Sequence, residues 1–144
     1  MDNGDEITGY NVLFESHDLE YYPSPACDAS LTTLPNGDLQ CTVPFTELRN
    51  APFNLQFLAT VKAKFNAYNL IGQGEYSQPN AEGSFIEVEP QAVRGITLDP
   101  ALSDTTSVHI TWTHLFLTVE TGASPVLNYL IKTDQGTGVW ADFD

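Results

Sequence analysis

The chain has few basic residues, two cysteines and no long apolar run. Its 144 residues hold five Lys and Arg against nineteen Asp and Glu, a formal net charge of −14. Because so acidic a chain repels phosphate, we expect no nucleic-acid partner and no attraction to anionic lipid. The acids are scattered rather than grouped, which favours a solvated surface over a dedicated ion site.

Membrane-spanning and leader signals are also missing. No stretch approaches the roughly 18 apolar residues of a spanning helix, so we expect no direct membrane insertion in this segment. The acidic opening from Met1 to Glu6 lacks the basic end and apolar stretch of a signal peptide. We expect any such signal to lie upstream of this segment.

Enzyme motifs are not found. The sequence has no Gly-x-Ser-x-Gly, no Gly-Lys-Ser/Thr loop and no His-Glu-x-x-His. His17, His109 and His114 are interpreted as ordinary surface histidines. Gly72-x-Gly74 joins two expected strands rather than a strand and a helix, which favours a turn over a phosphate site. We therefore do not expect an enzyme.

Period-two alternation of apolar and polar residues predicts β-strands and no long helix. The pattern covers residues 10–14, 65–69 and 108–112. Gly-bearing turn signals lie between such segments at an interval suited to a β-sandwich. Pro90 is the best boundary candidate, because proline cannot donate to a β-ladder and often marks an interdomain link.

Two distant segments share the same alternation. Residues 7–12 and 126–131 match around Tyr10 and Tyr129, which are 119 positions apart. This spacing slightly exceeds one ordinary β-sandwich domain. The chain therefore looks like a window cut from a longer repeat array.

Segment 61–77 resembles the F strand and F–G turn of a fibronectin type III module, through Ala67-x-Asn69-x-x-Gly72-x-Gly74 and the following Ser77. Segment 107–112 is similar to that family's B strand with its core tryptophan, and 122–131 to its B–C turn and C strand.

The resemblance implies an all-β fold of immunoglobulin-like β-sandwich modules in tandem, both incomplete. Residues 1–90 would hold strands C to G of one module, and 91–144 strands A to C′ of the next. The implied core positions are Tyr10, Val12, Leu55, Phe65, Ala67, Trp112, Tyr129 and Ile131.

The middle of the chain, with Cys41 and Pro44, resembles variant modules of very large repetitive surface and secreted proteins of single-celled eukaryotes. Common animal modules have a corner tyrosine in strand F where this chain has Val61. A hydroxyl bond across that corner is therefore ruled out, and we expect Pro52-Phe53 to supply rigid apolar packing instead.

The two cysteines give information on the cellular compartment of the protein. Cys27 and Cys41 enclose Pro35-Asn-Gly37, a strong reversal signal, so their flanks can return as a hairpin. A disulfide here would close a loop of about 15 residues, contribute roughly 3 kcal/mol and hold the Cα atoms about 5–6 Å apart. Buried free thiols and a metal site are the alternatives, although zinc would need further ligands. A disulfide would favour an extracellular or cell-surface location. The sequence has no Asn-x-Ser/Thr sequon, so N-glycosylation adds no support for that location.

Acidic residues near the expected junction are weak Ca²⁺ candidates, because oxygen ligands from two modules would suit that ion. Their spacing matches no calcium motif, and we expect no other cofactor. The four residues are Glu87, Glu89, Asp99 and Asp104. Leu98-Asp99-Pro100 looks like an acidic tripeptide of the kind that adhesion receptors recognise, a match that often arises by chance.

We expect a non-enzymatic structural or interaction module of a large extracellular repeat protein: a spacer, adhesive stalk or filament subunit, with neighbouring modules or other copies as partners. The alternative is an adhesion or recognition receptor that binds a protein or glycan through loops such as 18–30 or 73–77. An intracellular scaffold is the third possibility.

The incomplete modules predict exposed strand edges and half-formed cores. The missing strands would come from chain outside this segment or from neighbouring copies arranged head to tail. Folding back of residues 91–112 onto residues 1–90 is a further route, which the short link at Pro90 disfavours.

Overall fold

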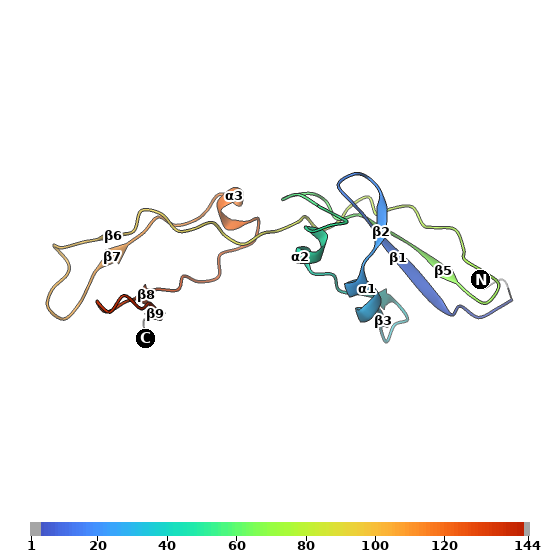
Figure 1. Ribbon diagram of the computed structural model, residues 1–144, viewed down its shortest axis with the longest axis horizontal. Helices are drawn as coiled ribbons and strands as arrows, with labels where there is room; N and C mark the ends of the chain where they lie inside the picture. The colour runs from blue at the N-terminus through green and yellow to red at the C-terminus, as the bar shows by residue number, and fades with distance from the viewer. Residues whose placement is uncertain (1–3, 143–144) are drawn as a thin grey trace. The chain divides into compact units, whose positions relative to one another are not determined.

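In the computed structural model, which describes residues 4–142, the chain divides into two compact units. Unit 1 is Met1–Glu87 and unit 2 is Val88–Asp144, a division close to the boundary expected at Pro90. Each unit consists mainly of small antiparallel sheets with short helices (Figure 1). The protein is therefore β-rich.

Unit 1 is built on a three-stranded antiparallel sheet with the order β2-β1-β5. These strands are β1 (Gly9–Glu15), β2 (Tyr21–Pro23) and β5 (Ala63–Tyr68), so β1 and β5 cover most of the strands predicted at 10–14 and 65–69. The register between β1 and β5 places alternate residues of both strands on one apolar side. We call this side the unit 1 sheet face; it consists of Tyr10, Val12, Phe14, Ala63, Phe65 and Ala67.

Segment 73–77 covers the outer edge of β5. The backbone N–H groups of Gly74 and Ser77 donate to the carbonyl oxygens of Ala67 and Phe65 at 2.9 and 2.8 Å. β5 is therefore hydrogen-bonded along both edges, and this segment is not a free loop.

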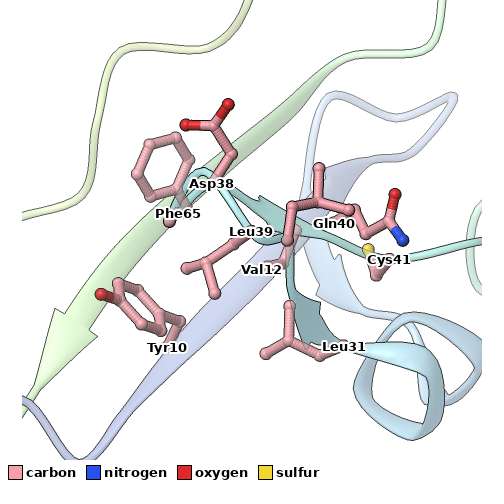
Figure 2. A pocket seen from close by; sticks show the side chains of 10 residues that line it. Tyr10, Val12, Leu31, Asp38, Leu39, Gln40, Cys41 and Phe65 are labelled. Carbon is pink, nitrogen blue, oxygen red and sulfur yellow. The ribbon is translucent and has the colours of Figure 1, made fainter.

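Short elements follow β2 along the chain: α1 (Pro25–Ser30), β3 (Thr32–Thr33), β4 (Leu39–Gln40) and α2 (Phe45–Leu48). α1 starts where Ser24 caps it, its hydroxyl accepting from the Cys27 N–H at 3.1 Å, and proline occupies the first turn. β3 and β4 form the hairpin expected around Pro35-Asn-Gly37. Figure 2 shows this hairpin beside the Tyr10 end of the unit 1 sheet face.

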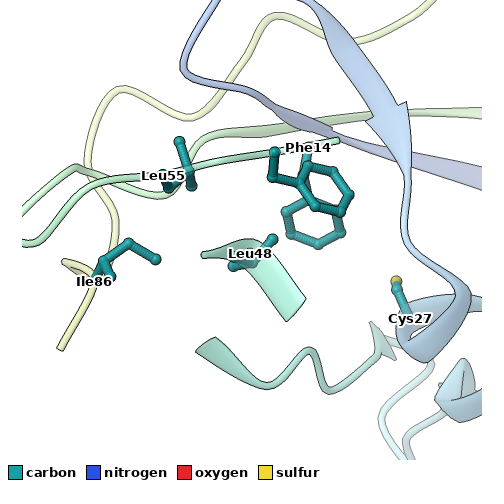
Figure 3. Packing of buried hydrophobic residues seen from close by; sticks show 6 residues of the cluster. Phe14, Cys27, Leu48, Leu55 and Ile86 are labelled. Atoms are coloured by element: carbon teal, nitrogen blue, oxygen red, sulfur yellow. The ribbon is translucent and has the colours of Figure 1, made fainter. Parts of the chain in front are cut away.

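The core of unit 1 lies at the Phe14 end of the sheet. Phe53 is fully buried and makes edge-to-face ring contacts with Phe14 and Tyr22, with ring centres 6.4 and 6.3 Å apart. The expectation of apolar packing at Phe53 is thus confirmed. The remaining members of this buried cluster, drawn in Figure 3, are Cys27, Leu48, Leu55 and Ile86.

Burial at the expected core positions of unit 1 is uneven. Leu55 is buried, and Tyr10, Val12 and Ala67 are half-buried. Phe65 is 56% exposed, so the expectation of a buried core residue does not hold there. The physical reason is that the packed cluster covers the sheet face at Phe14 and leaves it open at Phe65.

Unit 2 has shorter strands than unit 1. β6 (Thr97–Leu98) pairs with β7 (Ile110–Thr111), α3 covers Thr118–Thr121, and β8 (Lys132–Thr133) pairs with β9 (Ala141–Asp142). β7 is the middle of the strand predicted at 108–112. Segment 126–131 does not form the predicted strand, because no described segment of unit 2 pairs with it.

Packing in unit 2 gathers around Trp112 and Tyr129. Their rings lie 5.6 Å apart, but both side chains are only half-buried, which corrects their expected core positions. Ile131 is 39% exposed, which corrects its expected core position and follows from the missing strand. Among the described residues of unit 2, Leu115 alone is a buried hydrophobic side chain.

The contrast between Phe53 and Phe65 gives a direct test of the core. Phe53→Ala should lower the free energy of unfolding of unit 1 by roughly 3–5 kcal/mol, because it empties a buried aromatic site. Phe65→Ala, the matched control, should cost less than about 1 kcal/mol, since its ring is largely solvated. Urea titration followed by tyrosine fluorescence measures both; equal losses would contradict this placement of the core.

Candidate functional site

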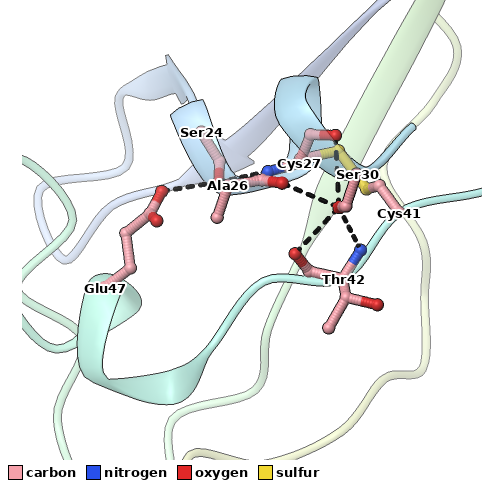
Figure 4. The surroundings of a disulfide bond; sticks show 7 residues. All are labelled: Ser24, Ala26, Cys27, Ser30, Cys41, Thr42 and Glu47. Atoms are coloured by element: carbon pink, nitrogen blue, oxygen red, sulfur yellow. Dashed lines mark hydrogen bonds between the residues drawn. A yellow bond between two sulfur atoms is a disulfide. The ribbon is translucent and has the colours of Figure 1, made fainter.

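The predicted disulfide between Cys27 and Cys41 is present. It joins α1 to the residue after β4, with the Cα atoms 4.9 Å apart, slightly closer than expected. Beside it, the Ser30 hydroxyl accepts from the Thr42 N–H at 2.8 Å, and its one proton lies closer to the Ala26 carbonyl oxygen, at 2.7 Å, than to the Thr42 carbonyl oxygen, at 3.1 Å (Figure 4). The base of the β3–β4 hairpin is therefore held by the disulfide and by the hydrogen bond from Thr42 to Ser30.

A second contact ties α1 to α2. The Ser24 hydroxyl donates to a carboxylate oxygen of Glu47 at 2.6 Å while it accepts from the Cys27 N–H. Ser24 is fully buried, so its hydroxyl needs both partners. The two helices and the disulfide form one cross-linked segment that contributes Cys27 and Leu48 to the core.

A pocket of about 650 Å³ lies between the β3–β4 hairpin and the open end of the unit 1 sheet face (Figure 2). Its wall on the sheet side consists of Tyr10, Val12 and Phe65. The hairpin side contributes Leu31, Leu34, Gly37, Asp38, Leu39, Gln40 and Cys41. This size suits a small ligand or several side chains, but the lining carries few polar groups that would orient a ligand.

The strand pattern of the sequence does not predict this pocket. Leu31, Leu34 and Leu39, spaced around the reversal that the disulfide closes, are the sequence signal for it. For α1, the signal is Ser24-Pro25, because a serine followed by proline is typical of a helix start.

The opposite side of the sheet carries charged and aromatic groups. The Tyr21 hydroxyl donates to Glu15 at 2.8 Å, and the Lys62 ammonium lies 3.1 Å from the same carboxylate. The Lys64 ammonium lies 4.0 Å from the Tyr21 ring centre and 5.1 Å from that of Tyr76. These contacts engage two of the five basic residues of the chain within the fold.

The pKa values of Glu15 and Tyr21 in this cluster are shifted. Burial opposes the charged form of Glu15, but the hydrogen bonds from Tyr21 and Lys62 and the Lys62 charge together hold its carboxyl pKa below the usual value. Burial and then the Glu15 carboxylate raise the pKa of Tyr21 to about 12. The cluster therefore favours a protonated phenol beside an ionised carboxylate.

In unit 2 a tyrosine hydroxyl joins two neighbouring residues. The Leu115 N–H donates to the Tyr129 hydroxyl at 3.1 Å, and the same oxygen lies 2.9 Å from Nδ1 of His114. These bonds hold the Tyr129 ring against Trp112. His109 is exposed, as expected of a surface histidine.

Asp104 is engaged by its own turn. The backbone and hydroxyl groups of Thr106 donate to its Oδ1, as do those of Ser107, and these bonds lower the pKa of the carboxyl to about 2. Asp99 likewise accepts from the Ala101 N–H at 2.9 Å. Local turns thus use both carboxylates.

Between residues 4 and 142, no three His, Cys, Asp or Glu side chains gather as a group that could hold a metal ion. Of the Ca²⁺ candidates, Glu87 belongs to unit 1, and Glu89, Asp99 and Asp104 belong to unit 2. Within the described residues, no helix is both long and apolar enough to cross a membrane.

The segments proposed as recognition loops are largely structured. Segment 18–30 contains β2 and α1, and segment 73–77 pairs with β5. Leu98 of the acidic tripeptide lies in β6.

No protein-family model, curated protein or solved structure matches this chain. The family resemblance therefore remains a prediction from the motifs.

Removal of the disulfide should destabilise unit 1. Reduction should lower its free energy of unfolding by about 3 kcal/mol, because a closed chain of this length loses less entropy on folding. The double variant Cys27→Ala/Cys41→Ala is the matched control and should match the reduced protein. Thermal melts with and without reductant measure the effect; an equal response of the double variant to reductant would contradict the assignment.

We expect Tyr21 to ionise only at high pH. Its pKa is raised to about 12, so the stability it contributes is complete below pH 10, the ordinary pKa of a tyrosine, and is lost as the pH rises through 12. Glu15→Gln removes the neighbouring carboxylate and should lower the Tyr21 pKa toward 10. An NMR titration of ring-labelled tyrosine follows both proteins; an unchanged Tyr21 pKa in Glu15→Gln would rule out the carboxylate as a cause.

Proposed function

We propose that this chain is part of a fibronectin type III-like tandem array in a large extracellular or cell-surface protein, similar to the repetitive surface proteins of single-celled eukaryotes. There it acts as a spacer, stalk or filament subunit rather than as an enzyme. The observation that carries the proposal is the antiparallel pairing of β1 with β5, the two segments assigned to strands C and F, which gives them one shared apolar face.

The disulfide supports the proposed extracellular or cell-surface location. Cys27 and Cys41 are the two cysteines of the chain, and disulfides persist mainly in oxidising compartments. The disulfide also cross-links a small unit whose packed core lies at one end of the sheet. Such a cross-link stabilises an extracellular module that has only a partial core.

Uncovered apolar surface supports a role in module contacts. Phe65 on the unit 1 sheet face and Leu98 on β6 are more than half exposed. Isolated surface hydrophobics are common, but rows of them on strands indicate an interaction surface. We assign neighbouring modules or other copies of the protein as the partners.

A second candidate, recognition of a partner by a loop, is favoured by the turn after β5. Leu70 and Ile71 project fully into solvent there. Three hydrogen bonds stabilise the turn, because the Asn69 side chain accepts from the N–H groups of Ile71 and Gly72 at 3.0 and 3.2 Å, and the Asp5 carboxylate accepts from the Leu70 N–H. An apolar tip of this kind suits contact with a protein surface.

Location and oxidation in the native cell test the proposal. Intact cells are treated with a membrane-impermeant alkylating reagent and a protease, and the state of Cys27 and Cys41 is read by mass spectrometry. We expect a protease-accessible chain whose cysteines resist alkylation until reductant is added. Protection from protease, together with thiols that only a membrane-permeant alkylating reagent modifies and that need no reductant, would instead indicate the intracellular scaffold.

A further inference from the structure

The tip of the β3–β4 hairpin is a tight turn built on Pro35, Asn36 and Gly37. The Gly37 N–H donates to the Leu34 carbonyl oxygen at 2.9 Å, and the Leu34 N–H donates to the Asp38 carbonyl oxygen at 2.6 Å. Gly37 has a φ of +89°, whereas the φ of Asn36 is not positive. This is the pattern of a hairpin loop in which a type I turn is followed by a left-handed glycine.

The Asn36 side chain is held over this turn by Asp38. Its carbonyl oxygen Oδ1 accepts from the Asp38 N–H at 3.1 Å, and its amide nitrogen Nδ2 donates to the Asp38 carboxylate at 2.6 Å. The first bond closes an Asx-turn, the local ring that an asparagine side chain forms with the backbone two residues on. That ring contains both the Cγ atom of Asn36 and the amide nitrogen of Gly37.

These two atoms are the reactants of a self-modification that asparagine, a thermally labile residue, undergoes in water. The Gly37 amide nitrogen gives up its proton to hydroxide and attacks the Asn36 Cγ, so that a new C–N bond forms. The Cγ–Nδ2 bond breaks, and the departing nitrogen takes a proton from water and leaves as ammonia. Water then opens the cyclic imide at either carbonyl and gives aspartate or isoaspartate. The net reaction consumes water, releases ammonia and changes no oxidation state.

Sequence and exposure single out Asn36 among the described asparagines. The attacking nitrogen belongs to the next residue, and a glycine there has no Cβ to hinder the approach. The other described asparagines are followed by alanine, valine, leucine or tyrosine. Asn36 and Gly37 are both exposed, and no other atom lies within 4 Å of the place where a Gly37 Cβ would stand, so water reaches the turn.

We propose that Asn36 is a site of spontaneous covalent modification, at which attack by the Gly37 nitrogen converts the hairpin tip to aspartate and isoaspartate. The hydrogen bond from Gly37 to Leu34 holds the proton that must be lost first. The turn therefore has to open before the reaction, and the folded hairpin slows it. The inference goes beyond the proposed function and does not depend on it, because the reaction needs only water.

The product does not fit the turn that the amide occupies. A carboxylate at position 36 has no N–H to donate, and it brings a second negative charge to within hydrogen-bond distance of the Asp38 carboxylate. Isoaspartate also adds a carbon atom to the backbone of the loop. Because Gly37 and Asp38 line the pocket, modification changes one of its walls, while the disulfide keeps the base of the hairpin closed.

Incubation of the whole oxidised chain at mildly alkaline pH tests the proposal. Samples taken over time are digested at acidic pH and mapped by mass spectrometry, with electron-transfer fragmentation to separate isoaspartate from aspartate. Asn36 should convert before any other described asparagine, and faster as the pH rises, because hydroxide removes the Gly37 proton. Conversion should be faster still in urea, where the turn is open. Asn3-Gly4, whose Asn3 lies outside the described residues, is mapped separately.

Matched variants test the effect of the product on the turn. Asn36→Asp carries one product and should lower the protection of the Leu34 and Gly37 N–H groups against hydrogen exchange. The double variant Asn36→Asp/Asp38→Asn again places an amide opposite a carboxylate and should restore that protection. Asn36→Gln is the control for the chemistry, because its longer side chain closes the imide ring poorly and should stay unmodified.

Each part of the proposal has a result that would overturn it. Earlier conversion of another described asparagine, or no conversion of Asn36 in the folded chain under conditions that convert it in urea, would reject the modification site. Equal rates in the folded and the urea-unfolded chain would reject control by the turn. Unchanged protection in Asn36→Asp would reject the effect of the product on the hairpin tip.

Discussion

The register between β1 and β5 is the constraint on which unit 1 depends. A shift by one residue would exchange the apolar sheet face for the polar side of the same strands. Asn66, only 3% exposed, fixes this register on the polar side: it accepts from the Asn11 amide and donates to the Gly74 carbonyl, both at 2.9 Å. One buried amide thus aligns β1, β5 and the following segment, and the satisfied bonds make any other alignment costly.

This alignment gives the sheet face two ends with different roles. At the Phe14 end, Phe53 and Leu48 cover it and form the core. At the Tyr10 end, a hairpin held at its base by the Cys27–Cys41 disulfide leaves a pocket. The covalent link anchors the hairpin that forms the second wall of this pocket. The packed core and the exposed apolar surface therefore lie at opposite ends of one sheet.

The sequence predicts the features that depend on local pattern. Strand positions in unit 1 follow from alternation, and the disulfide follows from two cysteines around a reversal. Burial does not follow from alternation, because Phe65 and Phe53 are both aromatic and only packing from distant segments decides which is covered. Segment 126–131 has the same alternation as β1, yet a strand also needs a pairing partner, which no local pattern encodes.

The distribution of charge bears on how uncovered apolar surfaces are tolerated. Lys62, Arg94 and Lys132 form ion pairs with acids of the chain, and Lys64 lies against aromatic rings. Acidic residues remain in large excess, since nineteen stand against five basic residues. Repulsion between like-charged copies opposes association, most of all at low salt, where screening is weak. A strongly acidic surface around neutral strand faces therefore raises the electrostatic cost of bringing two copies together and reduces indiscriminate aggregation through those faces.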